Sequence, residues 1–201
     1  MPMISIALTG GVATGKSSAT KRLKTIWTDS AAFFSADEAV HELLTTTQIK
    51  TKITAVFGER VIDDDGEVSR SQLRQIVFRD ESLRRKLEGI LHPEVQAMAS
   101  RAEESALENH KQFLVYEIPL LYEVDSPVTR QKDVVVAASQ QTQRQRLSEK
   151  RGLETEVIEM IIGAQLPIET KMARADHVIW NDGTESELEE QVILLAELLE
   201  S

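Results

Sequence analysis

The chain contains no cysteine, so disulfide bonds and metal sites with cysteine ligands are excluded. It also contains no apolar run near the ~20 residues that a membrane-spanning helix needs. Internal repeats and low-complexity tracts are absent. Its first residues enter an apolar run directly, which leaves no room for a signal peptide. We therefore expect a cytoplasmic protein with no membrane partner.

Positive charge is scarce, because 23 Lys and Arg residues face 33 Asp and Glu residues, for a formal net charge of −10. A chain with this balance lacks the basic surface that a nucleic-acid partner requires. Its 201 residues, 41% of them hydrophobic, suffice for one domain, or for a core domain with small insertions. Whether the chain is a monomer or a small homo-oligomer stays open.

The most informative segment is GGVATGKS, residues 10–17, which has a glycine, four further residues and then Gly-Lys-Ser. Residues 3–9 before it are apolar and partly β-branched, and the residues after it can continue as a helix. Strand, loop and helix in this order form the structural context that a phosphate-binding loop needs. The alternative is a glycine-rich turn with no ligand.

Such a loop surrounds phosphate with backbone N–H groups at the positive end of a helix. Lys16 would reach the β- and γ-phosphates, while the Ser17 hydroxyl would ligate Mg²⁺. The sequence therefore predicts a nucleoside triphosphate with Mg²⁺. The expected contacts from this segment are Gly11, Val12, Ala13, Thr14, Gly15, Lys16, Ser17 and Ser18.

Apolar runs of strand length alternate with helical segments, which predicts a parallel α/β sheet of the P-loop type with about five strands. The last helix is expected to begin at a capping box, Thr184 with Glu187. Another is expected to begin at Pro93. The predicted strands are residues 3–9, 32–35, 113–118, 133–138 and 177–180.

Two stretches interrupt this alternation. Residues 36–111 are mostly helical, and residues 139–171 are rich in basic side chains. In a small-molecule phosphotransferase, an insertion of the first kind holds the acceptor, and one of the second closes as a lid that excludes water. The nucleotide-binding core would then comprise residues 1–35, 112–138 and 172–201.

Phosphoryl transfer also needs a carboxylate near the acceptor hydroxyl, and Asp37 is the candidate because it follows the second predicted strand. It could accept the proton or hold Mg²⁺ through water. Alternatively, it caps a helix over residues 38–44. Arg146 and Arg151 could contact phosphate or lie on a solvated helix face.

Three further side chains could have either a functional or a structural role. His92 and His41 are more typical of structural hydrogen bonding than of catalysis. Glu123, just beyond a predicted strand end, could orient substrate or cap the next segment.

Together these residues resemble the dephospho-CoA kinase family over nearly the whole chain. The elements that carry the resemblance are Leu8-Thr9-Gly10-Gly11 with the loop; Ala36-Asp37 and His41; Arg70, Leu73 and Phe78; Leu91-His92-Pro93; Pro119-Leu120-Leu121 with Glu123; Gln145-Arg146-Leu147, Arg151 and Gln165; and Ala175-Asp176, Ile179, Asn181 and Gly183.

The resemblance implies transfer of the ATP γ-phosphate to the ribose 3′-hydroxyl of dephospho-CoA, which yields CoA. It also implies a nucleotide core, a CoA-binding insertion and a lid. By position, Asp37 matches the catalytic base, and Arg146 and Arg151 match lid arginines near the phosphates. Asn181 with Gly183 lies where the family approaches adenine, whereas Arg70 and His92 fall in the acceptor region.

Two positions depart from the family pattern. Ser35 stands where an aspartate is usual, which leaves Asp37 as the retained carboxylate, and Ala13 stands where glycine is common. A nucleoside-monophosphate-type kinase remains one alternative. A regulatory P-loop module is another, although the chain lacks a guanine-reading Asn-Lys-x-Asp element, and residues 113–118 do not end in a Walker-B aspartate.

Overall fold

The computed structural model describes residues 2–123 and 128–201, with the backbone alone at Phe78. The chain divides into two compact units. The sheet unit comprises Met1–Ser35 and Ala102–Ser201, and the helical unit comprises Ala36–Arg101. The helix α5 (Glu81–Glu108) contributes residues to both.

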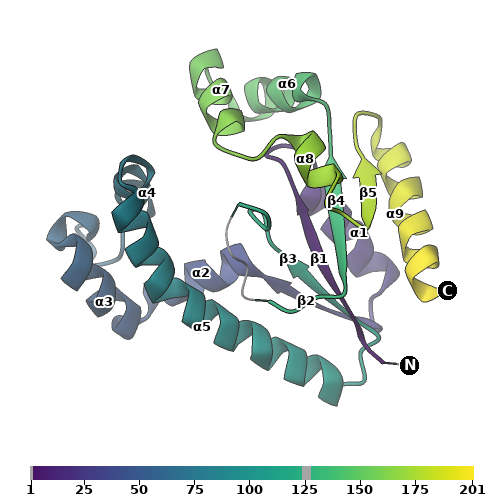
Figure 1. Cartoon of the computed structure of the whole chain (residues 1–201), viewed down its shortest axis with the longest axis horizontal. Coiled ribbons are helices and arrows are strands. Elements are labelled where there is room, and N and C mark those ends of the chain that lie inside the picture. Colours follow the sequence, from purple (N-terminus) through teal and green to yellow (C-terminus); the bar gives the residue numbers. More distant parts are fainter. Residues whose placement is uncertain (1, 124–127) are drawn as a thin grey trace. The chain divides into compact units, whose positions relative to one another are not determined.

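The sheet unit is built on five parallel strands in the order β2-β3-β1-β4-β5 (Figure 1). The predicted parallel α/β sheet is therefore confirmed, with strand ends within one residue of those expected. The strands are β1 Ile4–Gly10, β2 Ala31–Ser35, β3 Phe113–Glu117, β4 Lys132–Ala137 and β5 His177–Trp180.

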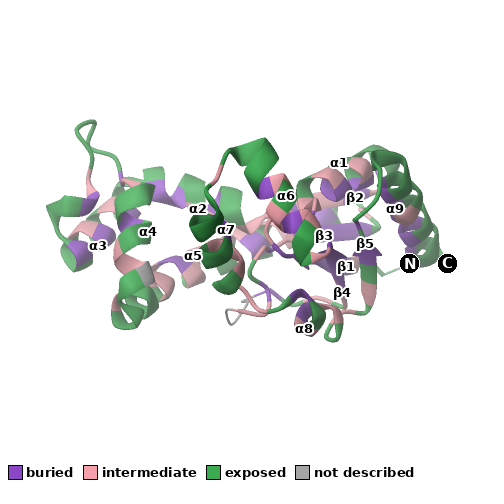
Figure 2. Cartoon of the chain, turned by 90° about the horizontal axis from the view of Figure 1, so that it is seen from above, coloured by how far each residue is buried: buried purple, intermediate pink, exposed green. Residues whose placement is uncertain are grey.

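Helices cover both faces of this sheet. On one face, α1 (Lys16–Ile26) and α9 (Glu185–Glu200) pack against each other over a continuous apolar core. On the other, α8 (Ile168–Met172) packs against β4. The remaining helices of this unit are α6 (Gln140–Arg151) and α7 (Thr155–Gly163). The three central strands are mostly buried (Figure 2), as expected of a parallel sheet.

The last helix begins as predicted. Thr184 and Glu187 form a reciprocal capping box at the start of α9. The inner face of α9 is buried against the sheet, at Leu188, Val192, Leu195 and Leu199. Trp27, directly after α1, is buried in the same core. Its ring stacks on that of Phe113, with 4.2 Å between the ring centroids.

The helical unit has its own buried apolar core, to which Ile53, Phe57, Val61 and Val95 contribute. It consists of α2 (Ala36–Thr45), α3 (Thr47–Phe57), a 3₁₀ turn (Glu59–Val61), α4 (Arg70–Arg79) and the first part of α5. None of the helices in the described ranges is long and apolar enough to cross a membrane.

The prediction that a helix begins at Pro93 is wrong, because Pro93 lies inside α5. A proline there removes the hydrogen bond to the carbonyl four residues earlier. The helix nevertheless continues, and apolar side chains are buried on both sides of the proline, at Leu91 before it and at Val95 and Ala99 after it. Burial of this apolar face outweighs the local signal.

Candidate active site

The segment 10–17 has the context that its pattern predicts, because β1 ends at Gly10 and α1 begins at Lys16. Two of its glycines are sterically required. A Cβ at Gly10, whose φ is +152°, would lie 2.1 Å from the Val136 carbonyl oxygen. A Cβ at Gly15, whose φ is +96°, would lie 2.2 Å from Asn181 Nδ2. The loop is therefore packed tightly against the segments beneath it.

Ala13 adopts a left-handed conformation, with φ of 56°. For a residue with a Cβ this conformation costs roughly 1–2 kcal/mol, which accounts for the preference for glycine at this position. The strain is maintained by the surroundings, since the Ala13 carbonyl accepts a hydrogen bond from Arg146 at 3.2 Å.

Distant segments hold the loop in shape. Asn181 Nδ2 donates to the Thr14 carbonyl at 2.8 Å, and the Val12 amide donates to Gln165 Oε1 at the same distance. Within the loop, the Thr14 hydroxyl donates to the Gly11 carbonyl at 2.9 Å. The contacts come from the turn after β5 and from the segment before α8, so tertiary structure fixes a loop that its glycines alone would leave free.

Lys16 lies across this loop. Its ammonium donates to the carbonyls of Gly10 at 3.3 Å and Gly11 at 3.0 Å. The cation is thus already held at the loop rather than extended into solvent. Ser17 and Ser18 follow in the first turn of α1, where Ser17 is exposed and Ser18 half-buried.

A carboxylate that the sequence analysis missed lies at the end of β3. Glu117 is paired in register with Leu8 of β1 and Ser35 of β2. Its Oε2 accepts a hydrogen bond from the Thr20 hydroxyl at 3.1 Å, one helical turn after Ser17. A Walker-B pattern predicts an aspartate at the end of such a strand, whereas this chain has a glutamate, which supplies the same carboxylate group.

Arg146, on α6, is half-buried and donates to the Asn181 carbonyl at 2.9 Å as well as to Ala13. It therefore does not lie on a solvated face. Arg151, at the end of the same helix, is exposed. Both arginines line a cavity of about 520 Å³ beside the loop, together with Gly15, Asn181 and Gly183.

This cavity carries a fixed negative charge in the turn after β5. Partial burial disfavours the charged form of Asp182, but hydrogen bonds from the amide and hydroxyl of Ser139 keep its pKa below the ordinary value. The nearby Arg146 guanidinium acts in the same direction.

The remaining predicted residues belong to the helical unit. Asp37 is exposed in the first turn of α2. The alternative that it caps a helix over residues 38–44 is wrong, because α2 already begins at Ala36. Arg70 is exposed at the start of α4 and lies 3.4 Å from His41 Nδ1, while His92 is half-buried within α5.

Comparison with known proteins decides the family. The family model described as dephospho-CoA kinase matches residues 4–187. A Bacillus cereus protein named dephospho-CoA kinase is 35% identical over 190 residues, which cover 94% of each chain. The chain belongs to the dephospho-CoA kinase family.

Two solved structures share the fold of this chain. A Thermus thermophilus crystal structure matches with a TM-score of 0.84 and 28% identity, and covers 98% of this chain and 99% of its own. The dephospho-CoA kinase from Campylobacter jejuni, at 21% identity, shows the fold alone, with a TM-score of 0.61 and coverage of 97% and 96%. As a member of the dephospho-CoA kinase family, the chain is an ATP-dependent kinase.

Proposed function

We propose that this protein transfers the γ-phosphate of ATP to the 3′-hydroxyl of the ribose of dephospho-CoA, which yields CoA. The observation that carries the proposal is a phosphate loop already in shape, with the Lys16 ammonium on its carbonyls, in a chain that belongs to this family. Phosphoryl transfer depends mainly on positioning and charge neutralisation, and this loop would supply both.

The nucleotide would occupy the sheet unit. Its phosphates would meet the backbone amides of residues 11–18, with Lys16 between the β- and γ-phosphates. The adenine would enter the cavity beside the loop, near Asn181 and Gly183. Arg146 and Arg151 would neutralise charge on the phosphates, because guanidinium groups form forked contacts with phosphate oxygens.

Oxygen donors near the loop fit Mg²⁺. Within the described ranges, no group of three or more His, Asp or Glu side chains forms a metal site by itself. Mg²⁺ rarely needs one, since it is usually held by one or two protein oxygens, substrate phosphates and water. Ser17 and Glu117 would hold the ion, and bound Mg²⁺ would neutralise charge on the phosphates.

The acceptor would bind through residues 36–111, where Arg70 and His92 are the candidate contacts. Asp37 would accept the proton of the 3′-hydroxyl as this oxygen attacks the γ-phosphorus and the bond from phosphorus to the β,γ-bridging oxygen breaks. Residues 139–171 would act as the lid, which would exclude water and so prevent ATP hydrolysis.

The experiment that tests this function is ATP consumption by the purified chain with Mg²⁺. Dephospho-CoA, AMP, adenosine and no acceptor are compared in parallel. We expect rapid ATP consumption only in the reaction that contains dephospho-CoA. The other three reactions should consume ATP at a background rate. Consumption that follows AMP would favour a nucleoside-monophosphate-type kinase, and consumption independent of any acceptor would favour a regulatory ATPase.

A further inference from the structure

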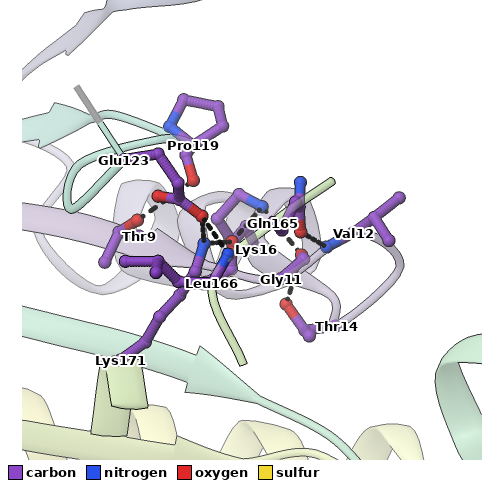
Figure 3. Close-up of polar contacts among 11 residues, drawn as sticks. Thr9, Gly11, Val12, Thr14, Lys16, Pro119, Glu123, Gln165, Leu166 and Lys171 are labelled. Carbon is purple, nitrogen blue, oxygen red and sulfur yellow. Dashed lines mark hydrogen bonds and ion pairs between the residues drawn. The ribbon is translucent and has the colours of Figure 1, made fainter. Parts of the chain in front are cut away.

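A buried ion pair lies behind the phosphate loop. The side chain of Lys171, on α8, is fully buried, and its Nζ lies 2.6 Å from Glu123 Oε1. The same ammonium donates to the Gly10 carbonyl at 3.5 Å. Figure 3 shows the two charged side chains pointing toward each other beside the loop. Through Lys171, the ion pair thus contacts Gly10, the first residue of the loop.

The pair is part of a larger connection. Glu123 Oε1 also accepts the Leu166 amide at 3.1 Å, and the neighbouring Gln165 accepts the Val12 amide at 2.8 Å (Figure 3). The segment 165–171 is therefore tied to the loop at Val12 and Gly10, and to Glu123 at Leu166 and Lys171. One carboxylate joins the end of the predicted lid region to the base of the loop.

Stability alone does not account for this arrangement. Removing two charges from water is costly, and apolar side chains of similar volume often stabilise a core as well or better. Glu123 Oε2 is buried and makes no hydrogen bond within the described residues, which adds to the cost. The interaction that apolar side chains would not supply is the contact of an ammonium with the Gly10 carbonyl.

The Gly10 carbonyl accepts hydrogen bonds from two lysines. It ends β1, and it also accepts a hydrogen bond from Lys16 at 3.3 Å. Two lysines thus share one acceptor, one from inside the loop and one from α8. A shift of this peptide would move both the start of the loop and the anchor of the phosphate-binding lysine.

We propose that Lys171 is a positioning residue for phosphate binding: Glu123 holds its ammonium against the Gly10 carbonyl, which keeps the loop in its phosphate-binding shape. The proposal deepens the proposed function and rests on it, since it requires that the loop bind nucleotide phosphates. Lys171 is fully buried and would act on phosphate only through the loop, so its effect should appear in the affinity for phosphate groups and not in the affinity for the nucleoside.

The test uses the full chain with three changes: Lys171→Met, Glu123→Gln and both together. Dissociation constants are measured for Mg·ADP by calorimetry and for adenosine by NMR titration. We expect Lys171→Met to weaken Mg·ADP binding by about tenfold or more, the range for a lost charged hydrogen bond. Adenosine affinity should stay within about twofold of wild type, because the base cavity is unchanged.

The double variant separates positioning from folding. Lys171→Met leaves the Glu123 carboxylate buried without its cation, which lowers thermal stability, and adding Glu123→Gln removes that charge and should restore stability. Mg·ADP affinity should nevertheless stay low in the double variant, because the Gly10 carbonyl still lacks the ammonium. Recovery of Mg·ADP affinity together with stability would overturn the proposal.

Lys132→Met is the matched control, because Lys132 pairs with Asp176 at 3.7 Å and its side chain is 44% exposed. It should leave both affinities unchanged. An equal loss in Lys132→Met, or an equal loss of ADP and adenosine affinity in Lys171→Met, would refute a specific positioning role. Failure of the wild-type chain to bind Mg·ADP would instead refute the proposed function.

Discussion

The sheet unit and the helical unit place their polar side chains in different ways. In the sheet unit, polar groups far apart in sequence converge on the phosphate loop, as in the contacts of Gln165 with Val12 and Asn181 with Thr14. Both units have exposed ion pairs, such as Arg144 with Glu159 in the sheet unit, at 43% and 48%, and Lys52 with Glu94 in the helical unit, at 43% and 31%. Among the described residues, only the sheet unit has an ion pair with a fully buried member, Lys171, whose side chain is 0% exposed.

This difference indicates that the binding regions for ATP and for dephospho-CoA differ in how far they are ordered before the ligand arrives. Groups that are locked by tertiary contacts before the ligand arrives lose little entropy on binding, so a site of this kind is preorganised. Asp37 and Arg70 are exposed, and they would be ordered by the acceptor itself. We therefore expect changes in the sheet unit to affect nucleotide binding and changes in the helical unit to affect the acceptor or the chemical step.

The largest effect is expected from Asp37→Asn, which removes the proposed base of the helical unit. The value of kcat should fall by about 10²–10⁴-fold, the range that general-base catalysis supplies, while the Kd for Mg·ADP stays near wild type. Steady-state kinetics and calorimetry test both. Asp64→Asn, in an exposed turn of the same unit, is the control. A loss of thermal stability with unchanged kcat would contradict the role.

Lys16→Ala should reduce kcat/KM for ATP by roughly 10²–10³-fold, because the cation for the developing phosphate charge is lost. Mg·ADP binding should weaken as well, unlike in Asp37→Asn. Lys21→Ala, on the exposed side of α1, should match wild type. Near-normal turnover in Lys16→Ala would mean that the loop does not bind the transferred phosphate.

Arg70→Ala addresses the helical unit. If Arg70 binds an anionic group of dephospho-CoA, the KM for the acceptor should rise by roughly ten- to a hundredfold, which corresponds to one charged hydrogen bond. The KM for ATP should not change. Arg74→Ala, exposed on the same helix, is the control. A rise in the KM for ATP alone would contradict the assignment of acceptor binding to the helical unit and nucleotide binding to the sheet unit.

Ala13→Gly has the smallest expected effect, and it increases stability. Glycine relieves the left-handed strain at φ of 56°, for a net gain of up to about 1 kcal/mol after the entropy of the unfolded chain is counted. Thermal unfolding should shift upward by roughly 2–4 °C. Ala102→Gly, within α5, should shift it downward, since glycine destabilises a helix. A lower Tm in Ala13→Gly would show that Ala13 is unstrained.

Local patterns predicted much of the fold. The alternating apolar runs identified all five strands, and Thr184 with Glu187 marked the start of α9. The loop pattern located the strand, turn and helix around Lys16. Each of these features is encoded by residues that are neighbours in the sequence, which is why the sequence alone suffices to predict them.

The features that were missed depend on pairing between distant segments. Glu117 gains its significance from its register with Ser35 and its bond to Thr20. Lys171 looked like one of several basic residues in an insertion, yet folding buries it against Glu123 and Gly10. Pro93 lies inside α5 and does not begin a helix, because apolar burial on both sides of it outweighs the local signal.

The most direct test of the central claim is the identity of the product. The chain is incubated with Mg·ATP and dephospho-CoA, and the product is identified by mass and by phosphorus–proton NMR coupling at the ribose. We expect dephospho-CoA to gain one phosphate, on the 3′-oxygen, with one ADP formed for each CoA. Unchanged dephospho-CoA beside ADP and free phosphate, or phosphate at another position, would contradict the claim.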